Sequence, residues 1–159
     1  MQIRKATTAD YDFLEEMLCE AATWRGSDDD ADVVRDPFIA RYIAGWGRAG
    51  DTGVLAEDDR GDAIGAAWFR FFPADEPGFG FVAPDVPELT VAVRRDARGH
   101  GVGTALVEAL VVSARAGRHR ALSLSVEEDN PAVRLYQRLG FVPVGRVGNA
   151  LTMQLDIED

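Results

Sequence analysis

The stretch from Glu88 to Ala116 constrains the fold most, because it joins a strand pattern to a helix pattern through a glycine-rich turn. Leu89 to Val93 is a short, largely β-branched run, and Gly103 to Ala116 is long and apolar enough for a helix. The glycines at 99, 101 and 103 remove Cβ atoms that would keep a ligand away from the backbone. Successive N–H groups there, followed by a helix N-terminus, can bind an anion, so the turn predicts a pyrophosphate site.

Two other glycine-rich signatures do not fit this turn. The loop of nucleotide hydrolases ends in Gly-Lys-Ser/Thr, whereas Gly103-Thr104 brings no lysine. The dinucleotide fingerprint G-x-G-x-x-G lies in the first βαβ unit, whereas these three glycines have a different spacing and come late in the chain. We therefore expect neither a magnesium–triphosphate site nor a dinucleotide site.

The composition suits one globular domain over residues 1–159, with 47% hydrophobic residues. No apolar run approaches the roughly 20 residues of a membrane span, and the N-terminus lacks the hydrophobic segment of a signal peptide. We expect a soluble, cytoplasmic protein that binds no membrane. Cys19 is the only cysteine, and no Cys/His spacing indicates a metal site, so no metal is expected.

The formal charge of −10 is spread unevenly along the chain. Residues 1–62 hold fifteen acids and seven bases, whereas residues 94–120 hold six arginines and two acids. This split argues against nucleic-acid binding by the whole molecule. It permits a basic pocket for a polyanionic cofactor beside an acidic half that attracts a cationic acceptor.

Hydrophobic periodicity and turn residues predict further strands on both sides of the central stretch. These strands are expected at Gln2 to Ala6, Thr52 to Glu57, Ala63 to Phe72, Ala121 to Val126, Phe141 to Val147 and Ala150 to Ile157. The segment from Pro73 to Pro87 contains four prolines and two glycines, and is predicted to be a loop packed by its own aromatic side chains.

Three helices are predicted outside the central stretch. Thr7 to Asp10 provides an N-cap for a helix that runs to about Ala22. A second helix begins at Asp28-Asp29-Asp30, continues to Ile43 with a kink or restart at Pro37, and ends at Gly45 and Gly47. Asn130-Pro131 begins a helix that Gly140 ends, with Tyr136 pointing inward.

Two motifs resemble those of the GNAT superfamily of acyl-CoA-dependent N-acyltransferases. Arg98, Gly101 and Gly103 match its acyl-CoA loop, which reads Arg or Gln, any two residues, Gly, any residue, then Gly or Ala. Residues 130–141, NPAVRLYQRLGF, resemble its second motif, in which Asn opens a helix and Leu-Tyr, then Gly-Phe, close it. The resemblance implies an α/β (α+β) GNAT fold, with a mixed central sheet of about seven strands flanked by four helices. The sheet is expected to splay between its fourth and fifth strands.

The same resemblance implies acetyl-CoA as the co-substrate and assigns residues to it. The backbone of Val91 and Val93 would hydrogen-bond the pantetheine arm like an added strand. Main-chain N–H groups from Arg98 to Gly103 and the Thr104 hydroxyl would hold the pyrophosphate. Asn130 would contact the cofactor, cap its helix, or do both. The complete expected set is Val91, Ala92, Val93, Arg98, Gly99, His100, Gly101, Val102, Gly103, Thr104, Asn130 and Tyr136.

The implied chemistry is direct attack of a neutral amine on a thioester in a ternary complex. By resemblance, Tyr136 is the general acid that protonates the departing thiolate, with a core tyrosine as the alternative. Glu88 is the candidate base, although alternation places it opposite Val91 and Val93 unless a bulge intervenes. Without a bulge it would be a solvated acid at the strand end. Glu127 and Glu128 are other candidates, and water alone is a further alternative.

The acceptor is expected between the two N-terminal helices and the Pro73 to Pro87 loop. Candidate acceptor residues, chosen by position, are Trp24, Arg25, Asp28, Asp29, Phe69 and Phe71. The predicted function is an N-acetyltransferase acting on the primary amine of a small molecule or a peptide N-terminus. The alternatives are an acyl-CoA-binding sensor without turnover and an acyltransferase that uses a longer acyl-CoA. The resemblance also suggests a homodimer formed through the C-terminal hairpin.

Overall fold

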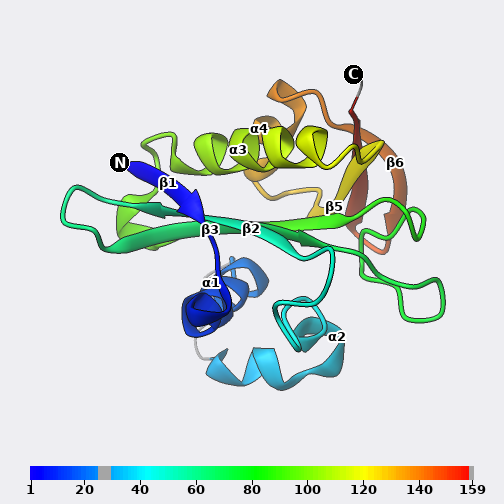
Figure 1. The fold of residues 1–159 in the computed structure, drawn as a ribbon. Helices are drawn as coiled ribbons and strands as arrows, with labels where there is room; N and C mark the ends of the chain where they lie inside the picture. Colours follow the sequence, from blue (N-terminus) through cyan, green and yellow to red (C-terminus); the bar gives the residue numbers. More distant parts are fainter. Residues whose placement is uncertain (25–29, 158–159) are drawn as a thin grey trace. The chain divides into compact units, whose positions relative to one another are not determined.

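A computed structural model describes residues 1–24 and 30–157 of the chain (Figure 1). The chain divides into two compact units. The first unit comprises Met1–Phe69 and Thr90–Leu110, and the second comprises Arg70–Leu89 and Val111–Asp159. Each unit has its own buried apolar residues, which include Leu14, Leu55 and Leu106 in the first and Leu122 and Met153 in the second.

Seven strands are present in the described part of the chain. They are β1 (Gln2–Lys5), β2 (Thr52–Glu57), β3 (Ala63–Arg70), β4 (Glu88–Val93), β5 (Ala121–Glu127), β6 (Val142–Val147) and β7 (Ala150–Asp156). Their hydrogen-bonding order is β1-β2-β3-β4-β5-β7-β6. The β4–β5 pair is parallel, whereas the β1–β2, β2–β3, β5–β7 and β6–β7 pairs are antiparallel. This mixed order confirms the expected α/β fold class.

The α-helices are α1 (Tyr11–Ala22), α2 (Pro37–Ala40), α3 (Val102–Ala116) and α4 (Ala132–Arg138). Within residues 1–24 and 30–157, no helix is long and apolar enough to cross a membrane. The α1 helix ends at Ala22, as the sequence predicts. The restart predicted at Pro37 is confirmed, because α2 begins there. The segment before it, Asp30–Arg35, is however a 3-10 helix, and α2 ends at Ala40, before the predicted end. The Asp36 side chain accepts a hydrogen bond from the Phe38 N–H at 2.9 Å, so Asp36 caps a new helix that restarts at Pro37.

In the first unit, the two faces of β3 pack against different helices. A Cβ atom built on Gly65 would lie 3.0 Å from Leu106 Cδ1 on α3. On the opposite face, the Trp68 indole N–H donates to the Tyr42 carbonyl, just after α2, at 2.9 Å. Strand alternation explains this division, because residues 65 and 68 project from opposite faces. In Figure 1, α1 and α2 accordingly lie on one side of β2 and β3, and the N-terminal part of α3 lies on the other.

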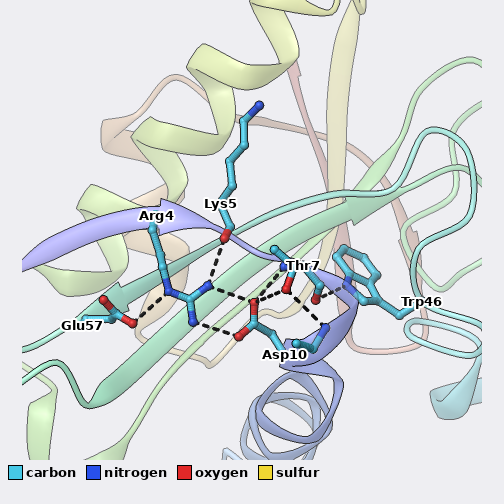
Figure 2. Close-up of polar contacts among 7 residues, drawn as sticks. Arg4, Lys5, Thr7, Asp10, Trp46 and Glu57 are labelled. Carbon is cyan, nitrogen blue, oxygen red and sulfur yellow. Dashed lines mark hydrogen bonds and ion pairs between the residues drawn. The ribbon is translucent and has the colours of Figure 1, made fainter.

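A polar cluster joins β1, β2 and the start of α1 (Figure 2). The Arg4 guanidinium donates to the two Asp10 carboxylate oxygens at 2.8 and 2.9 Å and to Glu57 at 2.8 Å. The Asp10 carboxylate also accepts the Thr7 N–H at 2.7 Å, which completes a capping box at the helix start. The Trp46 indole N–H donates to the Thr7 carbonyl at 3.2 Å. The N-cap predicted from Thr7 to Asp10 is therefore confirmed.

In the second unit, β5 pairs with β7 over seven residues, and β6 pairs with β7 through the turn at Gly148-Asn149. The Asn130 side chain accepts the Ala132 N–H at 2.9 Å and caps the start of α4. Gly140 has a φ of +101°, and the Phe141 N–H donates to the Tyr136 carbonyl at 3.0 Å. Gly140 therefore ends the helix in the left-handed conformation, as predicted, and the hydrogen bond from Phe141 completes a Schellman motif.

We expect Asp10→Asn to lower the free energy of unfolding at pH 7, because the ion pair with Arg4 is lost. The loss should be only about 1 kcal/mol, because Arg4 is partly exposed and solvent screens the pair. Hydrogen bonding by the Arg4 guanidinium holds the pKa of Asp10 below its ordinary value of 3.8. A carboxyl group whose pKa is lower in the folded than in the unfolded state stabilises the folded protein fully at pH values above its unfolded pKa. This stabilisation is lost as the pH falls through the folded pKa. The difference between variant and wild type in urea denaturation should therefore be full at pH 7 and shrink towards pH 3.

The matched control is Asp59→Asn, because the Asp59 side chain is 98% exposed and pairs with the N-terminal ammonium. It should leave the free energy of unfolding nearly unchanged at both pH values. An Asp10→Asn effect of equal size at pH 7 and pH 3 would contradict an ionic origin for this cluster's stability.

Candidate functional site

The glycine-rich turn of the first unit exposes its backbone. Gly99 and Gly101 have φ values of +83° and +80°, a conformation that other residues rarely adopt. A Cβ atom built on either glycine would have no other atom within 4 Å. Among the described residues, the N–H groups of residues 99–104 donate no hydrogen bond of ordinary geometry. The turn and the first residues of α3 therefore present the donors that a diphosphate requires.

Ion pairs connect α1 to the segment that leads into this turn. Glu16 accepts hydrogen bonds from Arg94 at 2.8 and 3.2 Å. Glu20 lies 3.4 Å from Arg98 Nη2 and 3.5 Å from Arg95 Nε. The two acids are four positions apart and share one helix face. Two acids of the acidic segment, residues 1–62, therefore form ion pairs with arginines of the basic segment, residues 94–120, inside the first unit.

The end of β4 lies beside β3 in the same unit. Val91 and Val93 are half-buried, and Ala92 is 9% exposed. A Cβ atom built on Gly65 of β3 would lie 3.1 Å from the Ala92 carbonyl oxygen. The Val93 carbonyl accepts a hydrogen bond from Arg98 Nε at 3.0 Å. Arg98 therefore fixes the end of the strand in addition to leading into the glycine turn.

Tyr136 is buried in the second unit, as the pattern of α4 predicts. Its side chain is 7% exposed, and its ring meets the edge of Phe141 with the ring centroids 5.9 Å apart. Burial raises the pKa of the Tyr136 hydroxyl well above its ordinary value, because the phenolate loses its hydration. The hydroxyl is therefore protonated at neutral pH, which is the state that a general acid requires.

Glu88 is also buried in the second unit, and the expectation of a solvated acid is wrong. Its side chain is 3% exposed, and Oε2 accepts the Gly80 N–H at 3.0 Å. A Cβ atom built on Gly80 would lie 2.5 Å from the Leu124 carbonyl carbon and 2.7 Å from the Ser125 nitrogen. The Pro73 to Pro87 loop therefore rests directly on β5 and covers Glu88.

The other carboxylates proposed as bases have different surroundings. Glu127 is half-buried, and its carboxylate lies 3.5 Å from the Asn149 side-chain nitrogen. Glu128 is exposed and forms an ion pair with Arg146 at 2.8 Å. Within residues 1–24 and 30–157, no three His, Cys, Asp or Glu side chains form a group that could hold a metal ion.

A model of the acetyltransferase (GNAT) family matches residues 11–141. The chain belongs to this family. The L-amino acid N-acyltransferase MnaT of Escherichia coli is 30% identical over 166 residues, which cover 99% of this chain and 90% of that protein. The mycothiol acetyltransferase of Saccharomonospora viridis is 37% identical over 91 residues, which cover 57% of this chain and 29% of that longer protein.

The structure is also similar to that of yncA of Salmonella typhimurium, determined with its cofactor acetyl-CoA. The TM-score is 0.73 at 27% sequence identity, and the match covers 100% of this chain and 95% of that chain. These findings confirm the expected GNAT fold. They also confirm the expected enzyme class, an N-acetyltransferase that uses acetyl-CoA on amine substrates.

The acceptor residues expected in this GNAT protein have unequal access to solvent. Phe69 is completely buried, whereas Trp24 and Phe71 are half-buried. Phe71 contacts the His119 ring edge-on, with the centroids 5.2 Å apart. Arg25, Asp28 and Asp29 lie outside the described residues.

Sequence reasoning missed the part that Gly80 plays at this site. The glycine lies in a loop with four prolines, so its presence alone gives no signal of a close approach to a strand more than 40 positions away. Only the packing of the loop on β5 explains why position 80 excludes a side chain.

Gly80→Ala should destabilise the protein by about 1–3 kcal/mol, because the added methyl group meets rigid backbone atoms. The loop must shift, which lengthens the Gly80–Glu88 hydrogen bond. Thermal denaturation measures the effect, and Gly145→Ala is the control because a Cβ atom there would lie 3.8 Å from the Thr152 Cβ, an ordinary contact. Equal melting temperatures for Gly80→Ala and wild type would show that the loop tolerates displacement.

Proposed function

We propose that the protein transfers an acetyl group from acetyl-CoA to the α-amine of an amino acid or of a closely similar small molecule. The observation that carries the proposal is the run of main-chain N–H groups at residues 99–104 that donate no hydrogen bond among the described residues, which suits a diphosphate. The likeness to an L-amino acid N-acyltransferase over 99% of the chain supports an amino acid as acceptor. We assign the reaction to the cytoplasm, as the family resemblance implies.

Acetyl-CoA supplies an activated acetyl group as a thioester, and the residues of this chain bind and orient it. We propose that the amides from Arg98 to Gly103 and the Thr104 hydroxyl hold the diphosphate. The main chain of Val91, Ala92 and Val93 would hydrogen-bond the amide groups of the pantetheine arm. Asn130 would contact the cofactor in addition to capping α4.

Proton transfer is the second part of the proposal. A peptide-type α-amine with a pKa near 8 is neutral in about one molecule in ten at pH 7, whereas a lysine-like amine is neutral in about one in 10³. Glu88 would take the proton from the acceptor. A main-chain N–H of β4 would stabilise the charge that develops on the carbonyl oxygen. Tyr136, buried and protonated, would give its proton to the departing thiolate.

The acceptor residues chosen from the sequence are proposed one by one. Trp24 and Phe71 are the proposed contacts with partly exposed side chains, and Arg25, Asp28 and Asp29 remain proposed contacts by position. Phe69 would not touch the acceptor, because its side chain has no accessible surface. It would support the acceptor contacts only by packing in the core.

We further propose that the C-terminal hairpin can pair with a second copy of the chain. All six residues of β6 are exposed, and β6 is the last strand in the hydrogen-bonding order. Val142, Val144 and Val147 are each more than half exposed. An edge strand with apolar side chains favours pairing with another strand.

Acetyl-CoA should bind the isolated protein and raise its melting temperature. At a free concentration about 100 times the Kd, linkage stabilises the folded state by about 2.7 kcal/mol. Calorimetry and a free-thiol assay over L-amino acids, a dipeptide and a polyamine then test binding and turnover separately. Binding without thiol release from any amine would indicate a sensor, and absence of binding by folded protein would overturn the proposal.

Tyr136→Phe should lower kcat by about 10²–10⁴-fold while leaving the Kd for acetyl-CoA nearly unchanged, because only the acidic proton is removed. The ring and its contact with Phe141 are retained in the variant. Tyr11→Phe is the matched control, because Tyr11 is 36% exposed at the start of α1 and has no proposed role in the chemistry. Unchanged kcat in Tyr136→Phe would remove Tyr136 from the acid role.

A further inference from the structure

Two hydroxyl groups of the second unit have no role in the proposed mechanism. Ser125 on β5 and Thr152 on β7 are directly paired in the antiparallel β5–β7 register. Thr152 is only 7% exposed and Ser125 is half-buried, yet neither hydroxyl forms a hydrogen bond with another described residue. A buried hydroxyl without a partner is unfavourable, so its presence in a folded protein needs an explanation. A ligand that binds both hydroxyls would provide one.

These two side chains, the hydroxyl pair, belong to the same face of the sheet. Residues directly opposite each other in an antiparallel pair project from one face, with Cβ atoms about 5 Å apart. Glu127 follows Ser125 by two positions, so it shares this face about 7 Å further along the strand. Its side chain is half-buried. The face therefore offers two neutral hydroxyls side by side, with a carboxylate beyond them.

A glycine on β6 leaves room beside the Thr152 hydroxyl. Gly145 is paired with Thr152 in the β6–β7 register. Among the described residues, a Cβ atom built on Gly145 would contact only Thr152, at 3.8 Å from Cβ and 3.9 Å from Oγ1. Gly145 is itself exposed, so the space that a side chain would fill there is open to solvent. A small polar group can occupy this space within reach of Thr152 Oγ1.

The proline-rich loop ends its cover of β5 before the hydroxyl pair. A Cβ atom built on Gly80 would lie 2.5 Å from the Leu124 carbonyl carbon and 2.7 Å from the Ser125 nitrogen, so the loop crosses β5 between the side chains of residues 123 and 125. Ser123 is 0% exposed, whereas Ser125 is half-buried. A ligand can therefore reach the hydroxyl pair, while Ser123 is enclosed.

The hydroxyl pair lies near a proposed cofactor contact. The strand β5 ends at Glu127, whose carbonyl accepts the Asn130 N–H at 2.9 Å. Asn130 caps α4, the helix that carries Tyr136. In the proposed function, Asn130 contacts the cofactor and Tyr136 protonates its sulfur. A ligand on the hydroxyl pair would thus lie at the end of β5 that leads to these two residues.

We propose that the hydroxyl pair binds the end of the acceptor's side chain and selects an uncharged polar group, such as a carboxamide, over an apolar or acidic one. The inference rests on the proposed function, in which the acceptor is an amino acid. Each hydroxyl can donate and accept, and a carboxamide presents one carbonyl oxygen and two N–H groups. An apolar side chain would leave both hydroxyls without a partner. Glu127 disfavours an acidic side chain by like-charge repulsion.

The first test compares L-glutamine, L-norleucine and L-glutamate, which have side chains of similar length, through kcat/KM in a free-thiol assay. The wild type should favour glutamine by about 10-fold or more. Thr152→Val keeps the shape and removes the hydroxyl, so it should lower kcat/KM about 10-fold with glutamine and leave norleucine nearly unchanged. Thr152→Ser keeps a hydroxyl and should retain the preference. The KM for acetyl-CoA should be the same in all three proteins.

Two serines on the same strand provide the partner variant and its control. Ser125→Ala removes the other hydroxyl, so it should reduce the preference for glutamine as Thr152→Val does. The matched control is Ser123→Ala, because Ser123 shares the strand and the face but is enclosed by the loop. It should leave the ratio of kcat/KM between glutamine and norleucine unchanged.

The second test fills the space beside Thr152. Gly145→Val should raise the KM for glutamine about 10-fold, because the added side chain occupies the place of the carboxamide. The KM for L-alanine should stay nearly unchanged, since its side chain is too short to reach the hydroxyl pair. The melting temperature should not fall, because valine suits an exposed strand position.

The results separate the side-chain subsite from the proposed function. If the wild type acetylates glutamine and norleucine equally well, or if Thr152→Val lowers kcat/KM equally with both, the subsite is overturned and the proposed function stands. A wild type that prefers glutamate also overturns the subsite. If the wild type binds acetyl-CoA but releases no thiol with any amine, the proposed function and the subsite fall together.

Discussion

The buried carboxylate of Glu88 accepts the Gly80 N–H, and this contact fixes how the second unit is assembled. A buried charge is unfavourable unless hydrogen-bond donors surround it, and N–H donors to a carboxylate are among the stronger hydrogen bonds. Gly80 can supply the donor only because it has no side chain to collide with Leu124. The start of β4, the proline-rich loop and the middle of β5 are therefore held together at one point.

In the first unit, the proposed role requires that main-chain donors be presented to a charged ligand. Gly99 and Gly101 keep their backbone open, and Arg98 stays close because it holds the Val93 carbonyl and pairs with Glu20. Main-chain N–H groups cannot rotate away as long side chains can. A turn of this kind therefore binds an anion with little loss of conformational entropy, and the ion pairs to α1 limit its movement.

The sequence predicts those parts of the structure whose signals are local. The Thr7 to Asp10 cap, the end of the last helix at Gly140 and the break between the last two strands after Val147 depend on residues a few positions apart. All three form as expected. The restart of the second helical segment at Pro37, also predicted, has an equally local cause. Asp36 satisfies the N–H of Phe38, and Pro37 lacks an N–H, so the segment restarts instead of continuing. For the candidate site, local signals identify the glycine turn and the inward direction of Tyr136.

The burial of Glu88 could not be predicted, because alternation assigns a face but does not say what covers it. Only the contact between Gly80 and Leu124 shows that the loop covers Glu88. The ion pairs of Glu16 and Glu20 with arginines likewise join positions more than 70 apart, so no local pattern indicates them. The burial of Ser123 has the same origin, because a serine between Leu122 and Leu124 in an alternating strand indicates a solvent-facing side chain.

Burial also bears on the acid role proposed for Tyr136. In water, a tyrosine with a pKa of about 10 gives its proton unfavourably to a thiolate whose acid has a pKa of about 8.5, at a difference of about 2 kcal/mol. Burial alone would widen this gap, because it raises the pKa of Tyr136. However, a thiolate that forms in the same dry surroundings loses its hydration as well, and its pKa also rises. In the proposed mechanism the two desolvation effects oppose each other, so proton transfer from Tyr136 to the thiolate would keep roughly its cost in water.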